Sequence, residues 1–398
     1  MGHEVVGTAW QVLHWGPILA LSVIFTISAV AVKCCAMWWP PFDSIGGALN
    51  LLLFLTLVTL TLYNYFMAMF RGPGFVPIGW KPVRLYLKNP QHTKFLQFCD
   101  FCKGYKSPRS HHCRKCDRCV MKMDHHCPWI NTCCGHFNHA NFCYFLYFAP
   151  IGCIHALFIM LPSIYRAVHF QFYFYNRRDE PLVYLGVTGF VMAMFSIGLA
   201  IGVIIAVGML FYIQIRSVLK NETGIESWII DKALDRDRTE DEGDFIYPYH
   251  LGWRSNLRQV FTWSGKPRSD GLTWDVVEGC HQFTLTEEQL RQKAEKRERT
   301  VLYHITEAYS GRLFPCSKGL KVACWVPCTD EPRIVLKPGD RVLVTRWKKR
   351  WLYGTKLLTA EEKQVKQRVR GWFPRRCAKE LMDDNENMQG DFDEKKDA

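Results

Sequence analysis

Residues 99–133 read CDFCKGYKSPRSHHCRKCDRCVMKMDHHCPWINTC, and this cysteine-rich stretch decides the fold of the segment around it. One ligand spacing, C-x2-C-x9-H-x6-C, occurs twice in it, with the second copy fourteen residues after the first. A C-x2-C pair is the usual half of a tetrahedral zinc site, and each copy offers the closed set of a structural site. We therefore expect two zinc ions, bound by Cys99, Cys102, His112 and Cys119, and by Cys113, Cys116, His126 and Cys133. Spacing alone does not decide which histidine of each adjacent pair binds, because moving both by one residue keeps the period.

The same repeat leaves one sulfur over. The tripeptide His-His-Cys at 111–113 recurs at 125–127, but Ile130 stands where a third C-x2-C pair would need its second cysteine. Cys127 therefore has no metal set to join and lies beside a histidine and Asp124. Nearby zinc and basic residues favour a thiolate, and an adjacent base can take its proton. Cys127 is a candidate nucleophile; the alternatives are an inert structural cysteine and a finger that binds proteins without any chemistry.

Four long stretches almost without charge predict membrane spans: 15–39, 46–70, 140–165 and 182–215. About 20 apolar residues cross a bilayer, and each stretch is long enough. The first is not a typical signal peptide, because no Lys or Arg precedes it. Residues 71–139 hold twelve Lys or Arg and three Asp or Glu, whereas the loop at 40–45 has no Lys or Arg. The positive-inside rule then places the long loop and both termini in the cytosol, although the three arginines in 166–181 weakly oppose this.

The formal net charge of +13 has three possible explanations. Nucleic-acid binding is one, a polyanionic small substrate is another, and attraction of a membrane protein to anionic headgroups is the simplest. We therefore expect membrane lipids as partners and no nucleic acid. The 17 cysteines of a chain that faces a reducing cytosol argue for metal binding or chemistry over a disulfide framework.

The tetrapeptide Asp-His-His-Cys at 124–127, within this double zinc repeat and between spans two and three, resembles the DHHC-type protein S-acyltransferases. The resemblance covers roughly residues 10–265. It implies an enzyme that takes a fatty acyl group, such as palmitoyl, from acyl-CoA and passes it to cysteines of substrate proteins at the cytosolic membrane face. The acyl chain would lie in a cavity between the spans. A membrane-anchored zinc-finger adaptor without catalysis is the alternative.

The resemblance also implies roles for single residues. Cys127 would be the nucleophile, His125 the general base, and Asp124 the group that orients and polarises His125. His126 would then be a zinc ligand, and both zinc ions would be structural. Candidates for the phosphates of CoA are Arg109, Arg114, Lys115 and Lys122, each of which could equally be a solvated or lipid-facing charge.

Two departures from the family pattern affect the expected support of the site. Gly72-Pro73-Gly74 stands in place of Asp-Pro-Gly, and the run Thr223-Gly224-Ile225-Glu226 stands in place of Thr-Thr-x-Glu. Thr223 and Glu226 are retained as supporting residues, and loss of the second hydroxyl predicts an altered rate. A third supporting residue, Asn256, is expected to satisfy backbone groups near the active site.

The last third of the chain has a different pattern. Residues 231–250 are acidic and polar and predict a linker, and 286–300 are charged and helix-prone. Short alternating segments at 299–382, with RWLYG and GWFP, resemble a Src-homology-3-like barrel, whose aromatic ridge binds polyproline helices. Trp351, Phe373 and Pro374 fit that ridge, but Cys377 stands where a groove tyrosine is usual. Packing of the barrel against the membrane domain is the alternative to a protein partner.

A catalytic core followed by such a barrel resembles the endoplasmic-reticulum subfamily, which ends in a dilysine signal; here Lys395 and Lys396 lie fourth and third from the end. Cys316, Cys324 and Cys328 are expected to be core cysteines of the barrel or to be acylated themselves. The expected fold is a polytopic helical membrane protein with a double-zinc domain and a small all-β barrel. Its segments are the N-terminus 1–14, spans 15–70, zinc domain 71–139, spans 140–215, juxtamembrane segment and linker 216–298, barrel 299–382, and acidic tail 383–398.

Overall fold

The computed structural model describes residues 9–82, 94–177, 179–236, 238, 242–329, 331–359 and 369–381. The expected acidic tail with its dilysine end lies outside the described residues. The chain divides into two compact units, Met1–Gln289 and Leu290–Ala398.

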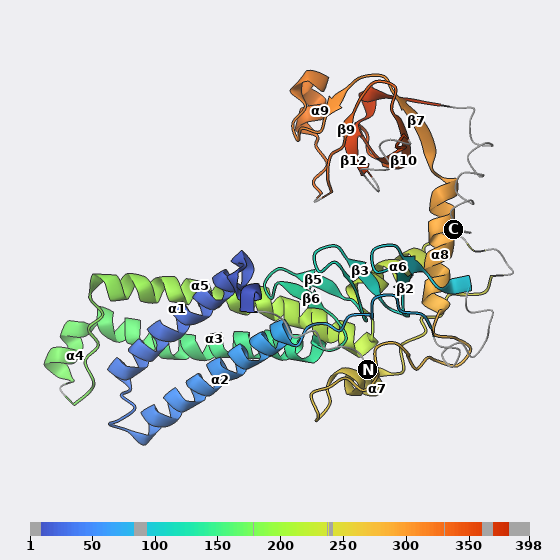
Figure 1. The fold of residues 1–398 in the computed structure, drawn as a ribbon. Coiled ribbons are helices and arrows are strands. Elements are labelled where there is room, and N and C mark those ends of the chain that lie inside the picture. The colour runs from blue at the N-terminus through green and yellow to red at the C-terminus, as the bar shows by residue number, and fades with distance from the viewer. Residues whose placement is uncertain are drawn as a thin grey trace. The chain divides into compact units, whose positions relative to one another are not determined.

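Four long apolar helices form a bundle in the first unit (Figure 1). They are α1 (Trp15–Trp38), α2 (Ile45–Phe70), α3 (His139–Val168) and α5 (Gly186–Lys220), and each is long and apolar enough to cross a membrane. The four predicted spans are thereby confirmed. The short helix α4 (Phe170–Asn176) lies between α3 and α5. Helix α5 extends past residue 215, where the apolar stretch ends, to Lys220. Asn221 ends it as a C-cap in the left-handed conformation.

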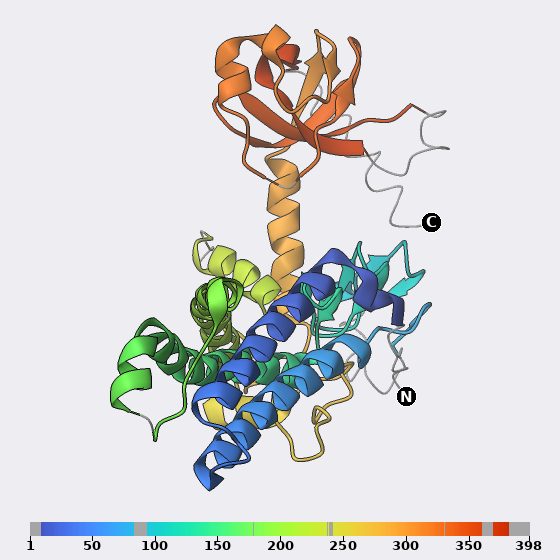
Figure 2. The ribbon, with the colours of Figure 1, turned by 90° about the vertical axis from the view of Figure 1, so that its left-hand side faces the viewer.

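Helix α3 is the centre of the bundle, since it packs against α1, α2 and α5 (Figure 2). Fully buried alanines line these contacts: Ala31, Ala156, Ala193 and Ala200. Small side chains let helix backbones approach closely, which is how helices associate where lipid offers no hydrophobic drive. The bundle therefore places the ends of α2, α3 and α5 at fixed positions around the segment that connects α2 to α3.

That connecting segment folds into three short hairpins: β1 (Phe98–Cys99) with β2 (Gly104–Tyr105), β3 (His111–Cys113) with β4 (Arg118–Val120), and β5 (His125–Cys127) with β6 (Thr132–Cys134). The sequence repeat is also a backbone repeat. Lys103, Asp117 and Asn131 follow one another at intervals of fourteen, and each has a positive φ. The third turn thus has the backbone of a metal-binding knuckle but carries Ile130 at the position of the second cysteine.

The short 3-10 helix η1 (Ala9–Leu13) precedes the bundle. After α5 come the helices α6 (Gly224–Leu234), α7 (Trp253–Val260) and α8 (Thr284–Glu298). Helix α8 confirms the predicted charged helix. The segment expected to be a linker is partly folded. Helix α6 runs to Leu234, and Tyr249 is buried in a cluster with Ile229 and Trp274.

The second unit is a small antiparallel β domain. Its five-stranded sheet has the order β12 (Val369–Pro374), β11 (Trp351–Lys356), β10 (Arg341–Trp347), β7 (Val301–Ile305), β13 (Ala378–Glu380). A separate pair, β8 (Tyr309–Ser310) and β9 (Val335–Leu336), and the helix α9 (Leu320–Cys324) complete it. The expectation of a small C-terminal domain built on antiparallel strands is confirmed. On its outer side β12 also pairs with the segment before β9, through an isolated bridge between Trp372 and Arg333.

Two expectations for this domain are wrong. Trp351 and Phe373 are fully buried and form its core, so they do not present an aromatic ridge. The indole Nε1 of Trp351 donates to the carbonyl oxygen of Val322 in α9 at 3.2 Å, which shows that α9 covers this ring. The expectation that three cysteines lie in the core of this domain is also wrong, because Cys316, Cys324 and Cys328 are exposed.

Candidate active site

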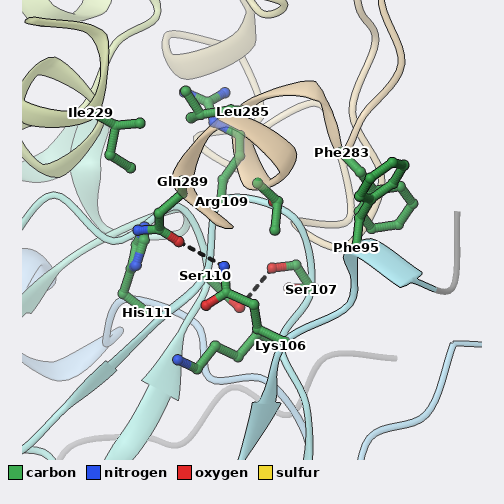
Figure 3. Close-up of a pocket in the computed structure, with 12 residues that line it drawn as sticks. Phe95, Lys106, Ser107, Arg109, Ser110, His111, Ile229, Phe283, Leu285 and Gln289 are labelled. Carbon is green, nitrogen blue, oxygen red and sulfur yellow. Dashed lines mark hydrogen bonds between the residues drawn. The ribbon is translucent and has the colours of Figure 1, made fainter. Parts of the chain in front are cut away.

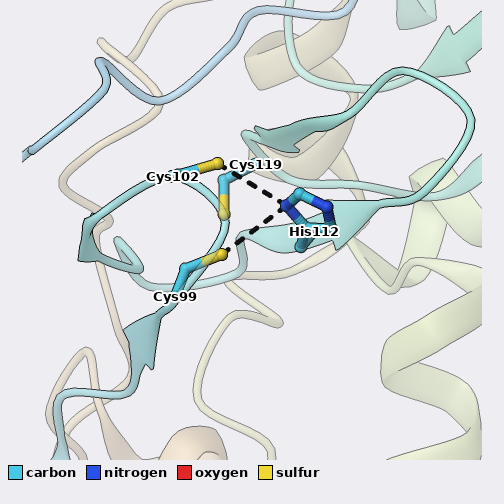
Figure 4. Close-up of side chains that lie close together, drawn as sticks. All are labelled: Cys99, Cys102, His112 and Cys119. Carbon is cyan, nitrogen blue, oxygen red and sulfur yellow. Dashed lines mark hydrogen bonds between the residues drawn. The ribbon is translucent and has the colours of Figure 1, made fainter. Parts of the chain in front are cut away.

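Each of the two expected ligand sets comes together in space. In the first, Nδ1 of His112 lies 3.5 Å from the sulfurs of Cys99 and Cys102 (Figure 4). In the second, Nδ1 of His126 lies 3.4 Å from the sulfur of Cys116 and 3.6 Å from that of Cys133. Within each set all four ligand atoms lie within 4.8 Å of one another. The two sets are Cys99, Cys102, His112 and Cys119, and Cys113, Cys116, His126 and Cys133.

This geometry fits zinc. Tetrahedral zinc holds sulfur at about 2.3 Å and nitrogen at about 2.0 Å, which separates neighbouring donors by about 3.5 to 3.8 Å. Three thiolates and one imidazole are also a donor set that zinc prefers. The geometry decides the question that spacing left open, because His112 and His126 face the sulfurs and His125 belongs to neither set. The ions would tie the three hairpins together, and both sets are closed.

The neighbouring histidine makes a different contact. Nδ1 of His125 lies 2.6 Å from Oδ2 of Asp124. Burial alone would raise the pKa of Asp124, but its hydrogen bond to His125 and the positive charge of that ring bring the pKa well below its ordinary value. Burial alone would lower the pKa of His125, whereas its hydrogen bonds to Asp124 and Cys127 raise it to about 10. The three residues therefore form a linked carboxylate, imidazole and thiol.

Cys127 is held from both sides by the ends of membrane helices. It is buried in a cluster that includes Tyr65 of α2 and Phe142 of α3. The hydroxyl of Tyr65 donates to the carbonyl oxygen of Trp129 at 2.7 Å. On the other side Gly16 of α1 lies so close that an added Cβ would stand 2.1 Å from the carbonyl oxygen of Pro128. The turn after Cys127 is thus clamped between α1 and α2.

Arg109 is occupied by a buried carboxylate. Its guanidinium binds Glu226 with both partners fully buried, at 2.6 Å from Nε to Oε1, and it also donates to Asn221. Lys122 is buried as well, and burial with the nearby charge of Arg109 lowers its pKa to about 7. These two expected phosphate ligands therefore lie inside the protein. Arg114 and Lys115, the other two, are exposed.

Glu226 connects this ion pair to the site. It completes a capping box at the start of α6, in which the hydroxyl of Thr223 accepts from the Glu226 backbone N–H at 3.2 Å. The first free amide of that helix belongs to Gly224, whose N–H donates to Oδ1 of Asp124 at 2.7 Å. A backbone donor thus supports Asp124 where the family pattern has a hydroxyl.

The other two family positions are also explained by contacts. Asn256 is fully buried, and its amide donates to the carbonyl oxygen of Leu219 at 2.7 Å, near the end of α5. It accepts from the backbone N–H of Leu251 at 3.1 Å. Gly74 has φ of 85°, and a Cβ there would stand 2.3 Å from the ring of Phe137. Position 74 therefore requires glycine for both conformation and space.

Two cavities in the described part of the chain adjoin the cysteine-rich segment. The larger has about 630 Å³, and His126 and Pro128, the neighbours of Cys127 in sequence, line it together with Lys115, Arg118 and His14. The smaller lies beside Ser107, Arg109 and Leu285 (Figure 3) and has about 20 Å³. That volume is enough for about one water molecule. Only the larger cavity has the volume of a ligand site.

Sequence reasoning missed three residues that position the site, Gly16, Tyr65 and Gln214, and it missed Arg118, which lines the larger cavity. Gly16 and Tyr65 have no mark in their local sequence, whereas Gln214 is a polar residue in an almost wholly apolar helix. Each of these acts across a contact between distant segments. Gln214, for example, donates from Nε2 to Oδ2 of Asp124 at 3.1 Å across 90 residues.

Known proteins are similar to this chain over the cysteine-rich segment and over nearly its whole length. The DHHC palmitoyltransferase family model matches residues 92–231. Human palmitoyltransferase ZDHHC6 is 49% identical over 97% of this chain and 95% of its own length. The zebrafish (Danio rerio) protein of the same name is 47% identical over 97% of this chain and 94% of its own length. Probable protein S-acyltransferase 16 of Arabidopsis thaliana is 34% identical over 56% of this chain and 76% of its own length. Together with the two metal sets and four spans, these matches show that the chain belongs to the DHHC palmitoyltransferase family.

Proposed function

We propose that this protein is a protein S-palmitoyltransferase that carries the acyl group on Cys127 between acyl-CoA and the cysteines of substrate proteins. The observation that carries the proposal is the position of Cys127. It has the backbone place of a zinc ligand but belongs to neither metal set, and it interacts with His125, whose Nδ1 contacts Asp124. A thiol with a base on one side and no metal is equipped for nucleophilic catalysis.

In the first step His125 takes the proton of the Cys127 thiol. The thiolate attacks the carbonyl carbon of acyl-CoA, the bond from that carbon to the CoA sulfur breaks, and CoA leaves as a thiol with the proton from His125. The raised pKa of His125 favours the state in which it holds the proton. Asp124 keeps Nδ1 protonated, so that Nε2 is the nitrogen that exchanges protons with sulfur.

In the second step a substrate cysteine gives its proton to His125 and attacks the Cys127 thioester. The acyl group moves to the substrate, and Cys127 recovers the proton. Both steps exchange one thioester for another, so the protein has to supply proximity and thiolate formation more than thermodynamic drive. Bound zinc would serve by fixing the hairpins that present these residues.

The CoA moiety is proposed to bind in the cavity of about 630 Å³. Its lining includes Lys115 and Arg118, and the exposed Arg114 is the next residue to Lys115. Cationic side chains of this kind bind phosphates through charge-assisted hydrogen bonds. This proposal keeps Arg114 and Lys115 from the expected set, adds Arg118, and gives Arg109 and Lys122 structural positions.

The proposal is tested by incubating the purified protein with labelled palmitoyl-CoA. We expect label on the wild type that hydroxylamine removes, none on Cys127→Ser, and normal labelling of the control Cys280→Ser, which changes a partly exposed cysteine outside both metal sets. Equal labelling of wild type and Cys127→Ser would contradict the enzyme and favour the non-catalytic adaptor.

We further propose residence in the endoplasmic-reticulum membrane, with the cysteine-rich segment in the cytosol and membrane-proximal cysteines of other proteins as acceptors. Support comes from the basic segment 71–139, the four spans, and Lys395 and Lys396. Replacing both lysines by alanine should release the protein to later compartments, as seen by fluorescence microscopy. Unchanged location would contradict the signal.

A further inference from the structure

Asp124 is held by more than its own histidine. Oδ2 accepts from Nδ1 of His125 at 2.6 Å and from Nε2 of Gln214 at 3.1 Å, and Oδ1 accepts from the N–H of Gly224 at 2.7 Å. These donors come from three elements, β5, α5 and α6. With Asp124 almost completely buried, few directions remain in which the carboxylate could turn.

The orientation of the Gln214 amide is fixed in turn. An ionised carboxylate only accepts hydrogen bonds, so Gln214 must present its NH₂ group to Asp124. Its oxygen Oε1 then lies 2.8 Å from Nε2 of His139, at the start of α3, so His139 must donate from that nitrogen. A flipped amide would place oxygen against oxygen at Asp124. Gln214 and His139 are both buried.

Gln214 is also unusual for its place. It stands near the end of α5, a helix whose sequence is otherwise almost wholly apolar from residue 186 to 215. A polar side chain in such a helix is costly unless it is paired, and those that occur mark functional positions. Here the amide NH₂ group donates to Asp124 in the reaction site, and the amide oxygen accepts from His139 in the first turn of α3.

From these contacts we infer that Gln214 is a positioning residue for acyl transfer: it holds the Asp124 carboxylate so that His125 faces Cys127, and His139 sets the direction of the Gln214 amide. The inference rests on the proposed function of Cys127. It links the geometry of the reacting groups to the packing of α3 on α5.

The test compares single-turnover acylation of Cys127 by palmitoyl-CoA in the wild type, Gln214→Met, His139→Phe and the double variant. Gln214→Met keeps the length of the side chain but removes the donor. We expect its maximal rate to fall about tenfold to a hundredfold, the effect of losing a hydrogen bond to a charged group. The half-saturating concentration of palmitoyl-CoA should stay within twofold of the wild-type value. The variant should still contain two zinc ions per chain.

Non-additivity distinguishes this role from general packing. His139 acts through Gln214, so His139→Phe should be slower than wild type, and the double variant should be no slower than Gln214→Met alone. Ser196→Ala, at a fully buried position in the same helix, is the control and should keep the wild-type rate.

A Gln214→Met rate within twofold of wild type, an effect on the half-saturating concentration alone, or additive losses in the double variant would overturn the inference. If Gln214→Met is not recovered folded, His139→Phe decides, and a wild-type rate there overturns it. Failure of the proposed function is a separate result, because Cys127→Ser would then label like the wild type.

Discussion

At the scale of single residues, the site is built on charges buried in pairs. Arg109 and Glu226 are fully buried, and Arg109 lies over the rings of Tyr249 and Trp274, at 4.3 and 4.6 Å from their centroids. Glu226 also accepts from the backbone N–H of Thr223. The Glu226 carboxylate thus orders the start of α6, where the Gly224 amide supports Asp124. Through Arg109 the same carboxylate anchors the cysteine-rich segment to α6.

Removing one partner of this pair leaves a buried charge without compensation. Arg109→Met should lower the free energy of unfolding by about 3–5 kcal/mol, measured by thermal or denaturant unfolding in detergent. Arg114→Met, at an exposed arginine of the same segment, is the control and should change it by less than about 0.5 kcal/mol. Equal stability of the two variants would contradict a structural role for Arg109.

His136 predicts a dependence of stability on pH. Burial lowers its pKa to about 3, although its Nε2–H donates to the carbonyl oxygen of Ser269 at 2.8 Å. Between about pH 6.5 and 3 the unfolded chain binds a proton that the folded chain does not, so stability falls as pH falls. From pH 7.5 to 5.5 the loss due to this group should be about 1.4 kcal/mol.

The check is the unfolding free energy at both pH values for the wild type and His136→Phe, which keeps a ring beside Trp274. Other groups, including the metal ligands, titrate in both proteins and cancel in the difference. The variant should lose about 1.4 kcal/mol less than the wild type on acidification. Parallel losses would show that His136 is not buried as a neutral ring.

At the scale of elements, the fourteen-residue repeat predicted the two metal sets and the spare thiol, because a hairpin fixes ligand geometry through local spacing. The four spans followed from length and apolar composition. The contacts that position the thiol could not be predicted in this way. Gly16 and Tyr65 reach the turn after Cys127 from α1 and α2, and such contacts depend on how the helices pack. Burial of Trp351 by α9 is a contact of the same kind.

Gly16 gives a direct test of this packing. Gly16→Ala places a methyl group 2.1 Å from the carbonyl oxygen of Pro128, so either α1 or the turn after Cys127 has to move. Displacement of reacting groups by about 1 Å costs on the order of a hundredfold in rate, and we expect a loss of this size in acylation with zinc retained. Gly198→Ala in α5, where a Cβ meets nothing within 4 Å, should be neutral. An unaffected Gly16→Ala would contradict the clamp.

At the scale of the whole molecule, the two units have separate hydrophobic cores. The membrane unit packs around residues such as Ala156 and Ile159, and the β domain packs around Trp351, Leu352 and Phe373. Separate cores predict that damage to one unit can leave the other folded.

Trp351→Ala should therefore destabilise the β domain by about 3–5 kcal/mol and leave acylation of Cys127 at the wild-type rate. Limited proteolysis should find new cleavage sites within residues 290–398 of the variant. Trp347→Ala, at an exposed position on β10, should be cut like the wild type. Loss of acylation in Trp351→Ala would show that the units depend on each other.

The central claim is that eight side chains are committed to two metal ions and that the ninth candidate, Cys127, is free to carry the acyl group. Its most direct test is mass spectrometry of the protein after incubation with palmitoyl-CoA, together with zinc analysis of wild type and Cys127→Ser. The account predicts a hydroxylamine-sensitive palmitoyl group on the peptide that contains Cys127, and two zinc ions per chain in both proteins. A palmitoyl group found only on other cysteines, or loss of a zinc ion in Cys127→Ser, would contradict it.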